Sequence, residues 1–369
     1  MRIKLFVLSL VVAAVSCGQR QKGSIAPSNR YACYFSVGDS VVVSVSPYDG
    51  IADTLIISAP LGNVVCMSTS YVACLQEIGA DSVVTGVSGV RFVSDSLVRE
   101  RAVEVGYEAA PDYERIVGLK PDVVFAYSVS ASLPQYVTKL RSLGIRVFML
   151  YEHLENHPLA RAEYVRLFGA LTGRRALADS VFDGVAARYL ELASKVADAV
   201  VTPRKVLINM PYGDQWYIPG GDSYMSRLVT DAGGVILGAE AGETKSSVIS
   251  VEKAFALSGE ADIWLHPGMC RTRDQIRSAH PLFEDFPVIR RDIYNNILRS
   301  TPGGGNDFWE SGAVRPDLVL SDLVAILHPE VAGESVLHYY IKVEQGSVGE
   351  GGGDVCGAVG SVAEMGDGG

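Results

Sequence analysis

The sequence is short of basic residues and of cysteine patterns that bind metals. Its 369 residues include 32 Lys and Arg against 42 Asp and Glu, which gives a formal net charge of −10. A protein that binds nucleic acid needs a basic surface to neutralise phosphates, so this function class is excluded. The six cysteines contain no C-x-x-C pair and no pair with zinc-ligand spacing. The cysteines therefore predict neither a zinc site nor a disulfide scaffold.

Motifs of hydrolases and nucleotide-binding proteins are also missing. There is no G-x-S-x-G and no H-E-x-x-H, and the glycine runs at 220–221 and 303–305 lack the spacing of a dinucleotide site. Tight turns explain such glycines. Sites for bare zinc or manganese need several His and carboxylate ligands at one point, whereas His280, His328 and His338 are expected in exposed segments. An enzyme, a bare-metal protein and a resident cofactor are all disfavoured.

The first 17 residues predict that the protein is exported from the cytoplasm. Arg2 and Lys4 precede an apolar run from Leu5 to Val15, which is too short to span a bilayer and is typical of a signal peptide. The segment 14–17 (Ala-Val-Ser-Cys) resembles a lipobox, in which Cys17 becomes the lipidated first residue. An ordinary signal peptide with an incidental cysteine is the alternative. Removing residues 1–16 takes away two bases and no acid, so the mature charge is 30 − 42 = −12.

Apolar strand-like runs alternate with helical patterns along most of the chain, which predicts an α/β fold with parallel sheets. One long helical stretch separates two such series, so we expect two lobes of like topology joined by one long helix. The predicted segments are a signal peptide (1–16), a lipidated tether (17–30), a small β element (31–60), an N-terminal α/β lobe (61–156), a connecting helix (157–202), a C-terminal α/β lobe (203–345) and a Gly-rich disordered tail (346–369).

Both predicted lobes contain the same local pattern. The stretch 112–125 aligns with 250–265: a capping residue, an acid two positions later, a short helix, a turn, then Asp and an apolar strand. The acids are Glu114 and Glu252. A carboxylate in a first helical turn is favoured by the helix dipole, and capping alone explains each one. Capping does not explain the same acid in both lobes, so we favour docking of the two acids on matching basic sites of a pseudo-symmetric partner.

The lipobox, the stretch 113–122 (YERIVGLKPD), the long helix and the repeated second-lobe pattern together resemble the periplasmic binding proteins of ABC importers for iron complexes and cobalamin. The resemblance covers about residues 60–330, and segments such as 304–310 resemble the Bacteroidetes branch. It implies two Rossmann-like lobes bridged by a rigid helix, with the ligand held in a cleft between them. It also implies that Glu114 and Glu252 pair with arginines of the permease, and that the protein is a monomer.

A planar, bulky ligand is held by aromatic walls and a few directed polar groups, and loops after strands are where α/β folds bind ligands. Packing between loops is the alternative role for Trp216 and Trp309, and helix capping is the alternative for Ser68. The predicted ligand-binding residues are Ser68, Thr69, Tyr71, Tyr127, Glu152, Trp216, Tyr217, Tyr224, Arg271, Asn306 and Trp309.

The sequence leaves the cargo open between a ferric siderophore, haem and cobalamin. Haem would take Tyr127, Tyr217 or His266 as its axial ligand. A lipoprotein of the same fold that senses a ligand, or serves as a scaffold, without feeding a transporter is the alternative function. The first expectation remains a membrane-anchored periplasmic protein that delivers a metal chelate to an ABC permease and its ATPase.

Overall fold

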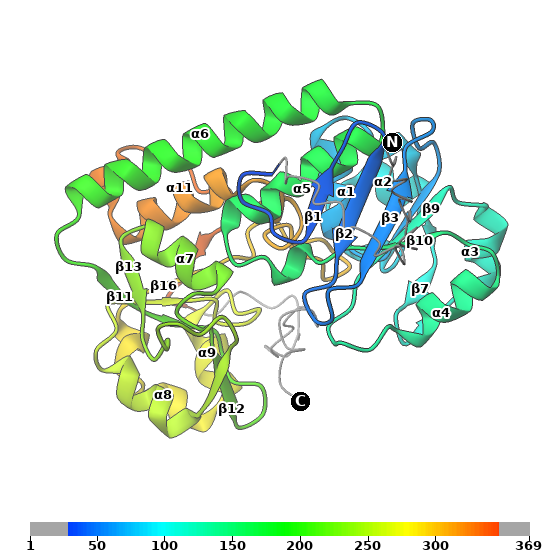
Figure 1. The fold of residues 1–369 in the computed structure, drawn as a ribbon. Coiled ribbons are helices and arrows are strands. Elements are labelled where there is room, and N and C mark those ends of the chain that lie inside the picture. The colour runs from blue at the N-terminus through cyan, green and yellow to red at the C-terminus, as the bar shows by residue number, and fades with distance from the viewer. Residues whose placement is uncertain (1–28, 347–369) are drawn as a thin grey trace, which may run out of the picture.

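The computed structural model describes residues 29–346. The signal peptide, Cys17 and nearly all of the predicted tether and Gly-rich tail lie outside the described residues. Two α/β lobes lie side by side, and one long helix runs across both of them (Figure 1). This confirms the predicted fold class of two lobes with parallel sheets joined by a long helix.

The first lobe is built on a five-stranded parallel sheet of order β10-β9-β4-β5-β6. Its strands are short and almost wholly buried, as expected when helices cover both faces of a parallel sheet. The chain runs outward from β4 to one edge and then returns to β9, so the direction of winding reverses between β4 and β9. In sheet order the strands are Val147–Met149, Val123–Ala126, Val64–Cys66, Val84–Val87 and Val103–Glu104.

Short helices and one small hairpin complete the first lobe. Each of three helices begins after a side chain that accepts a hydrogen bond from the first turn: Ser68, Asp95 and Asp112. The elements are α1 (Thr69–Glu77), α2 (Ser96–Arg101), α3 (Tyr113–Leu119), α4 (Gln135–Ser142), β7 (Gly106–Tyr107) and β8 (Ala110–Pro111).

The second lobe has a five-stranded sheet of order β13-β11-β15-β16-β17, parallel except for β17. Its winding reverses between β11 and β15. In sheet order the strands are Gly234–Ile236, Arg204–Ile208, Ile263–Leu265, Asp292–Asn295 and Ile341–Lys342. A separate two-stranded antiparallel sheet pairs β12 (Gln215–Ile218) with β14 (Ser247–Ser250). The helices are α7 (Tyr224–Asp231), α8 (Val251–Ser258), α9 (Arg273–Ala279), α11 (Pro316–Leu327) and α12 (Pro329–Ala332). The short helix α10 (Ser311–Val314) precedes α11 in the chain but packs mainly on helices of the first lobe, including α1.

The stretch expected to be one connecting helix contains two. Helix α5 (Pro158–Leu171) packs on the first lobe, and α6 (Arg175–Ala199) bridges the lobes. The chain breaks between them because Gly173 adopts a left-handed conformation at φ 72°. At about 1.5 Å per residue, the 25 residues of α6 span about 38 Å. None of the helices within 29–346 is long and apolar enough to cross a membrane.

An antiparallel three-stranded sheet precedes the first lobe and packs against its β10 edge and α5. Its strands are β1 (Phe35–Val37), β2 (Val41–Val45) and β3 (Ala52–Ile56). The buried carboxylate of Glu163 in α5 accepts backbone N–H groups from Arg30, Tyr31 and Ala32 at 2.8–2.9 Å. These hydrogen bonds hold the segment 30–32 against α5 of the first lobe.

Candidate ligand site and docking helices

In open α/β sheets, ligands bind beyond the carboxyl ends of the strands where the winding reverses. In the first lobe this point lies after β4 and β9, and the chain continues there as Ser68 and Tyr127. Ser68 caps α1, and both Ser68 and Thr69 are half-buried. The predicted capping role of Ser68 is confirmed, and ligand contact by these two residues stays a prediction.

Glu152, just after β10, is held inside this group of loops. Ser70 donates its hydroxyl hydrogen to Glu152 Oε1 at 2.7 Å, and His153 Nδ1 lies 3.7 Å from Glu152 Oε2. Burial acts to raise the pKa of Glu152, but His153 and the Ser70 hydroxyl outweigh it and lower that pKa. Glu152 is only 7% exposed, so it supports the loop with little surface left for a ligand.

The ring of Tyr127 is partly exposed on this side of the first lobe. This half-buried ring meets the ring of His153 edge to face, with centroids 5.6 Å apart. Burial, followed by the charges of Glu108 and Glu152, raises the pKa of Tyr127 to about 12, which keeps the phenol protonated at neutral pH. Glu108 comes from the β7–β8 turn and was not predicted, because its approach to Tyr127 depends on a hairpin too short to give a periodic pattern.

Arg161 of α5 connects the two lobes at the edge of this site. Its guanidinium lies 3.9 Å from the ring centroid of Tyr224, the first residue of α7, and Nη2 donates to the carbonyl oxygen of His153 at 2.7 Å. Tyr224 is only 4% exposed. The structure therefore corrects its predicted role: the Tyr224 ring packs against an arginine of the other lobe instead of facing a ligand.

Two more predicted aromatic contacts are wrong because the side chains are fully buried. Tyr71 is 0% exposed and packs against Phe125 and Phe168. Trp216 is also 0% exposed; its ring stacks on Phe286 and its Nε1 donates to the carbonyl oxygen of Ile208 at 2.8 Å. Both rings serve the cores of their lobes and have no surface to offer a ligand.

The winding reversal of the second lobe carries two strained residues. Asn209 directly follows β11 and His266 directly follows β15, and their φ angles are 69° and 58°. Such left-handed conformations are uncommon outside glycine and cluster at functional sites. His266 Nε2 lies 2.7 Å from the hydroxyl oxygen of Tyr340, and burial lowers the pKa of His266 to about 3, so the imidazole is neutral. Neither Asn209 nor Tyr340 was predicted, since only the sheet brings them to this edge.

Tyr217 and Arg271 stay predictions. The half-buried Tyr217 hydroxyl donates to Gln215 Oε1 at 2.8 Å. Arg271 is exposed, and its Nη2 reaches the carbonyl oxygen of Ile297 at 3.3 Å. Both side chains therefore have surface left for a ligand, although each already makes one local hydrogen bond.

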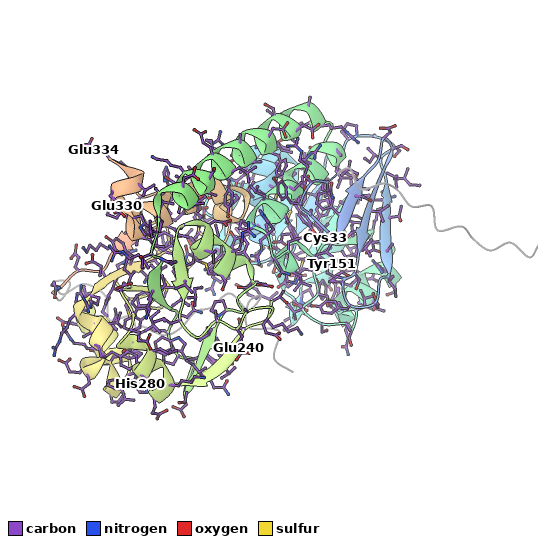
Figure 2. The ribbon with its side chains drawn as sticks, turned by 60° about the vertical axis from the view of Figure 1, so that its left-hand side comes forward. Cys33, Tyr151, Glu240, His280, Glu330 and Glu334 are labelled. Atoms are coloured by element: carbon purple, nitrogen blue, oxygen red, sulfur yellow. The ribbon has the colours of Figure 1, made fainter. Side chains whose placement is uncertain are left out.

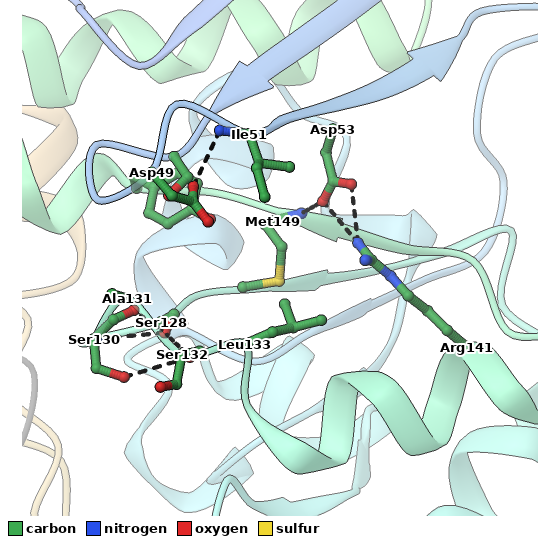
Figure 3. A pocket seen from close by; sticks show the side chains of 12 residues that line it. Asp49, Ile51, Asp53, Ser128, Ser130, Ala131, Ser132, Leu133, Arg141 and Met149 are labelled. Carbon is green, nitrogen blue, oxygen red and sulfur yellow. Dashed lines mark hydrogen bonds and ion pairs between the residues drawn. The ribbon is translucent and has the colours of Figure 1, made fainter.

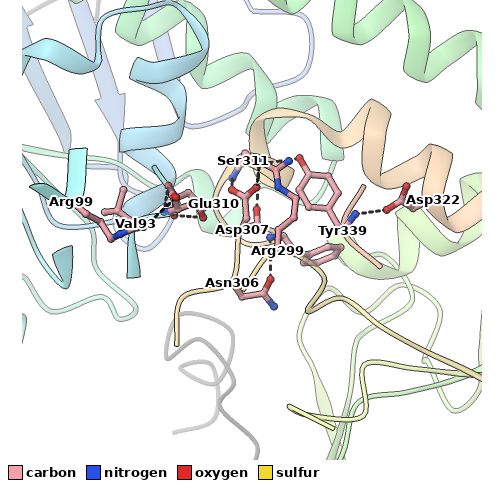
Figure 4. Close-up of polar contacts among 11 residues, drawn as sticks. Val93, Arg99, Arg299, Asn306, Asp307, Glu310, Ser311, Asp322 and Tyr339 are labelled. Atoms are coloured by element: carbon pink, nitrogen blue, oxygen red, sulfur yellow. Dashed lines mark hydrogen bonds and ion pairs between the residues drawn. The ribbon is translucent and has the colours of Figure 1, made fainter. Parts of the chain in front are cut away.

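Residues 299–310, here called the interlobe strap, contact both lobes: Arg299 lies over the ring of Tyr339 in the second lobe, and the Thr301 hydroxyl donates to the carbonyl oxygen of Arg91 in the first (Figure 4). A Cβ at Gly303 or Gly305 would collide with the backbone of Arg91 or Phe92, so glycine is required for this close approach. Asn306 Oδ1 accepts the Phe308 N–H at 3.1 Å. The half-buried Trp309 packs on Phe308 and lies 6.2 Å from His266, ring centroid to ring centroid. Packing explains the glycines, and ligand contact by Asn306 and Trp309 stays a prediction.

Glu310 ends the strap inside the first lobe. Its carboxylate accepts hydrogen bonds from the backbone N–H of Ser94 at 3.0 and 3.1 Å and from the Ser94 hydroxyl at 3.2 Å. Burial, and then the negative charge of Asp307, raises the pKa of Glu310 to about 8. The strap thus places a proton-binding group at the contact between the lobes.

The two predicted docking acids begin matching helices. Asp112 caps α3 and Ser250 caps α8, and Glu114 and Glu252 are both exposed in the first turns. The two helices belong to different lobes (Figure 1). From the acid onward the six residues of each helix repeat one order: two exposed, one buried, two exposed, one intermediate. A hydrogen bond from Ser250 lowers the pKa of Glu252. The acids are thus presented alike on the two lobes, and their pairing with a permease stays a proposal.

Comparisons with known proteins agree with this geometry. Residues 64–294 match the family model described as periplasmic binding protein. The chain belongs to the periplasmic binding protein family. It is therefore a binding protein and not an enzyme, as predicted. An uncharacterized lipoprotein from Methanocaldococcus jannaschii is 26% identical over 301 residues, covering 78% of this chain and 70% of the relative.

Other relatives of this periplasmic binding protein have named ligands. A cobalamin-binding protein from Halobacterium salinarum is 26% identical over 54% of this chain, which spans about half (52%) of that relative's length. A periplasmic haem-binding protein from Pseudomonas aeruginosa has a TM-score of 0.61 at 18% identity, over 78% of this chain and 100% of the other. A vitamin B12-binding protein from Vibrio cholerae has a TM-score of 0.52 at 13% identity, over 74% and 99%. The solved structures show a shared fold.

The histidines of this periplasmic binding protein are dispersed. His328 was expected in an exposed segment but is 4% exposed, with Nε2 2.9 Å from the carbonyl oxygen of Gly233. His280 lies at the far end of the second lobe, well apart from Tyr151 of the first (Figure 2). Within residues 29–346, no three His, Cys, Asp or Glu side chains are grouped to hold a metal ion.

Proposed function

We propose that the protein is a lipid-anchored periplasmic component of an ABC importer, which captures a metal chelate between its lobes and delivers it to the permease. The observation that carries the proposal is the pair of matching helices α3 and α8, because one exposed acid per lobe suits a partner with two matching basic sites. Family membership supports the same function.

The cargo class is proposed from the relatives and from the site. Relatives and structural neighbours bind cobalamin or haem, which are both large chelates with planar rings. In this chain Tyr127, which follows β9, and Trp309 of the interlobe strap, which lies 6.2 Å from His266, are partly exposed aromatic rings, and such rings pack well against planar ligands. A ferric siderophore, haem or cobalamin is the proposed ligand.

Membrane anchoring is proposed at Cys17, with the mature protein acting as a monomer in the periplasm. The lipobox-like segment 14–17 and the lipoprotein relative support this. Mass spectrometry of the membrane fraction tests it, since a diacylglyceryl modification on Cys17 is expected. If the Cys17→Ser variant stayed in the membrane fraction although its mass was that of an unlipidated chain, the proposed anchor at Cys17 would be refuted.

Binding measurements on the purified mature protein test the cargo. Cobalamin, haem and ferric siderophores are titrated one at a time by calorimetry. We expect one class to bind with 1:1 stoichiometry and a dissociation constant below about 1 μM, because a transporter must collect a scarce chelate. Absence of binding across the whole panel would reject the proposed cargo class.

A further inference from the structure

A second hollow lies beside the proposed ligand site. It has a volume of about 250 Å³ and is bounded by the β2–β3 turn, the loop that follows β9, α4 and the end of β10 (Figure 3). The β2–β3 turn precedes residue 64, where the match to the family model begins. The hollow shares two loops with the ligand site: Ser128 follows Tyr127, and Tyr151 precedes Glu152.

The floor of this hollow is buried and mostly polar. Ser46, Ser128, Met149 and Tyr151 are between 2% and 7% exposed. The Ser46 hydroxyl oxygen accepts the backbone N–H of Tyr48 at 3.3 Å. The Ser128 hydroxyl points to the carbonyl oxygens of Ser130 and Ser132, at 2.8 and 3.2 Å. These bonds fix the shape of the floor in advance of any ligand.

Among residues 29–346, one carboxylate on the wall of the hollow forms no ion pair. Asp53 is paired with Arg141 at 2.8 Å and accepts the Met149 N–H at 3.1 Å. Asp49 is exposed, and its carboxylate accepts a hydrogen bond from the uncharged Ile51 N–H at 3.0 Å. The Ile51 N–H first, and then the Ser46 hydroxyl, lower the pKa of Asp49, which keeps it ionised. An anionic ligand would be repelled here, and a cationic one attracted.

Apolar side chains complete the lining next to the acid. Ile51 and Leu133 are 67% and 45% exposed, and Met149 lies between the aspartate side and the serine loop (Figure 3). Covering such apolar surface with a hydrocarbon chain is favourable, at about 25 cal/mol per Å². The hollow therefore combines a carboxylate, hydroxyl groups and an apolar strip within the reach of one small group.

We propose that this hollow binds an alkylammonium group, with its ammonium at Asp49 and its hydrocarbon stem on Ile51 and Leu133. The group belongs either to a free small amine or to a side arm of the metal chelate held at Tyr127. The second source rests on the proposed function. Either way, the N-terminal sheet supplies a selective contact that favours cationic over anionic ligands.

Ligand-detected NMR with pentylammonium, pentanol and pentanoate tests the proposal on the mature protein. We expect pentylammonium to bind and the other two to bind at least tenfold more weakly. Asp49→Asn should weaken pentylammonium about tenfold, and Leu133→Lys should abolish binding, because it places a positive charge at the exposed rim. Asp39→Asn, an exposed acid at the other end of the same sheet, is the matched control and should bind as the wild type does.

Equal binding of pentanoate and pentylammonium, failure of pentylammonium to bind the wild type, or equal weakening by Asp49→Asn and Asp39→Asn would overturn the proposal. A ferric trihydroxamate with a terminal alkylammonium arm, compared with its N-acetylated form, separates the two sources. A preference for the free ammonium that Asp49→Asn removes assigns the hollow to the chelate arm. Binding of pentylammonium without binding of any chelate assigns it to a free amine, and then the proposed cargo fails while this inference stands.

Discussion

Helices α3 and α8 hold corresponding places in the two lobes and expose their residues in the same order, whereas the strand ends of the two lobes differ. In the first lobe, Tyr127 and the Ser68 turn are partly open. In the second, His266 is buried against Tyr340, and Trp216 lies in the core. The symmetric parts are those proposed to meet a symmetric partner. The asymmetric parts are those proposed to face a ligand, which has no reason to be symmetric.

The largest expected effect concerns the symmetric helices. Reversing both charges, with Glu114→Arg and Glu252→Arg, should reduce ATP-driven uptake of the cargo to background while leaving chelate affinity unchanged, since both acids are exposed. Glu191→Arg, an exposed acid on α6, is the control and should transport normally. Normal uptake by the double variant would end the docking role.

The next effect tests the asymmetry of the aromatic residues. Trp216→Ala should lower the free energy of unfolding by about 3–5 kcal/mol, because it empties a fully buried site. Trp309→Ala should cost less, since Trp309 is half-buried. Urea unfolding measures both. If the Trp216→Ala variant kept wild-type stability but lost chelate binding, Trp216 would be a ligand contact and not a core residue.

A third effect concerns the contact between the lobes. The pKa of Glu310 is raised to about 8, so its protonated form is favoured in the folded protein. Ionisation therefore costs stability as the pH rises from about 4.5, the unfolded value, to about 8. Glu310→Gln cannot ionise, so its stability relative to the wild type should rise by roughly 2–4 kcal/mol between pH 5 and pH 9. Parallel pH profiles from thermal unfolding would show that Glu310 is not buried at the strap.

The smallest effect compares the open residues of the two lobes. Tyr127→Ala should weaken chelate binding about tenfold, or about 1.4 kcal/mol, and Tyr127→Phe should retain most of the affinity because it keeps the ring. Tyr217→Ala should weaken binding less, since its hydroxyl is already bonded to Gln215. Calorimetric titration measures all three. A larger loss in Tyr217→Ala than in Tyr127→Ala would move the main contact to the second lobe.

The predictions from sequence succeeded where the signal is local. The caps Asp112 and Ser250 and the acids two residues later depend on spacing along one helix, and the structure places both pairs as expected. The predicted ligand contacts of Tyr71 and Trp216 were wrong, because a position near a strand end in the sequence does not decide which way the side chain faces. Asn209 and Tyr340 were missed because they reach their site only through pairing of distant strands. Glu108 was missed because its hairpin is too short to give a periodic pattern.

The structure of the complex with whichever chelate binds tests the central claim most directly. We expect a single ligand between the lobes, in contact with Tyr127 or Ser68 on one side and with Tyr217, Arg271 or Trp309 on the other. A ligand seated on one lobe alone, or on the outer face of either lobe, would contradict that claim.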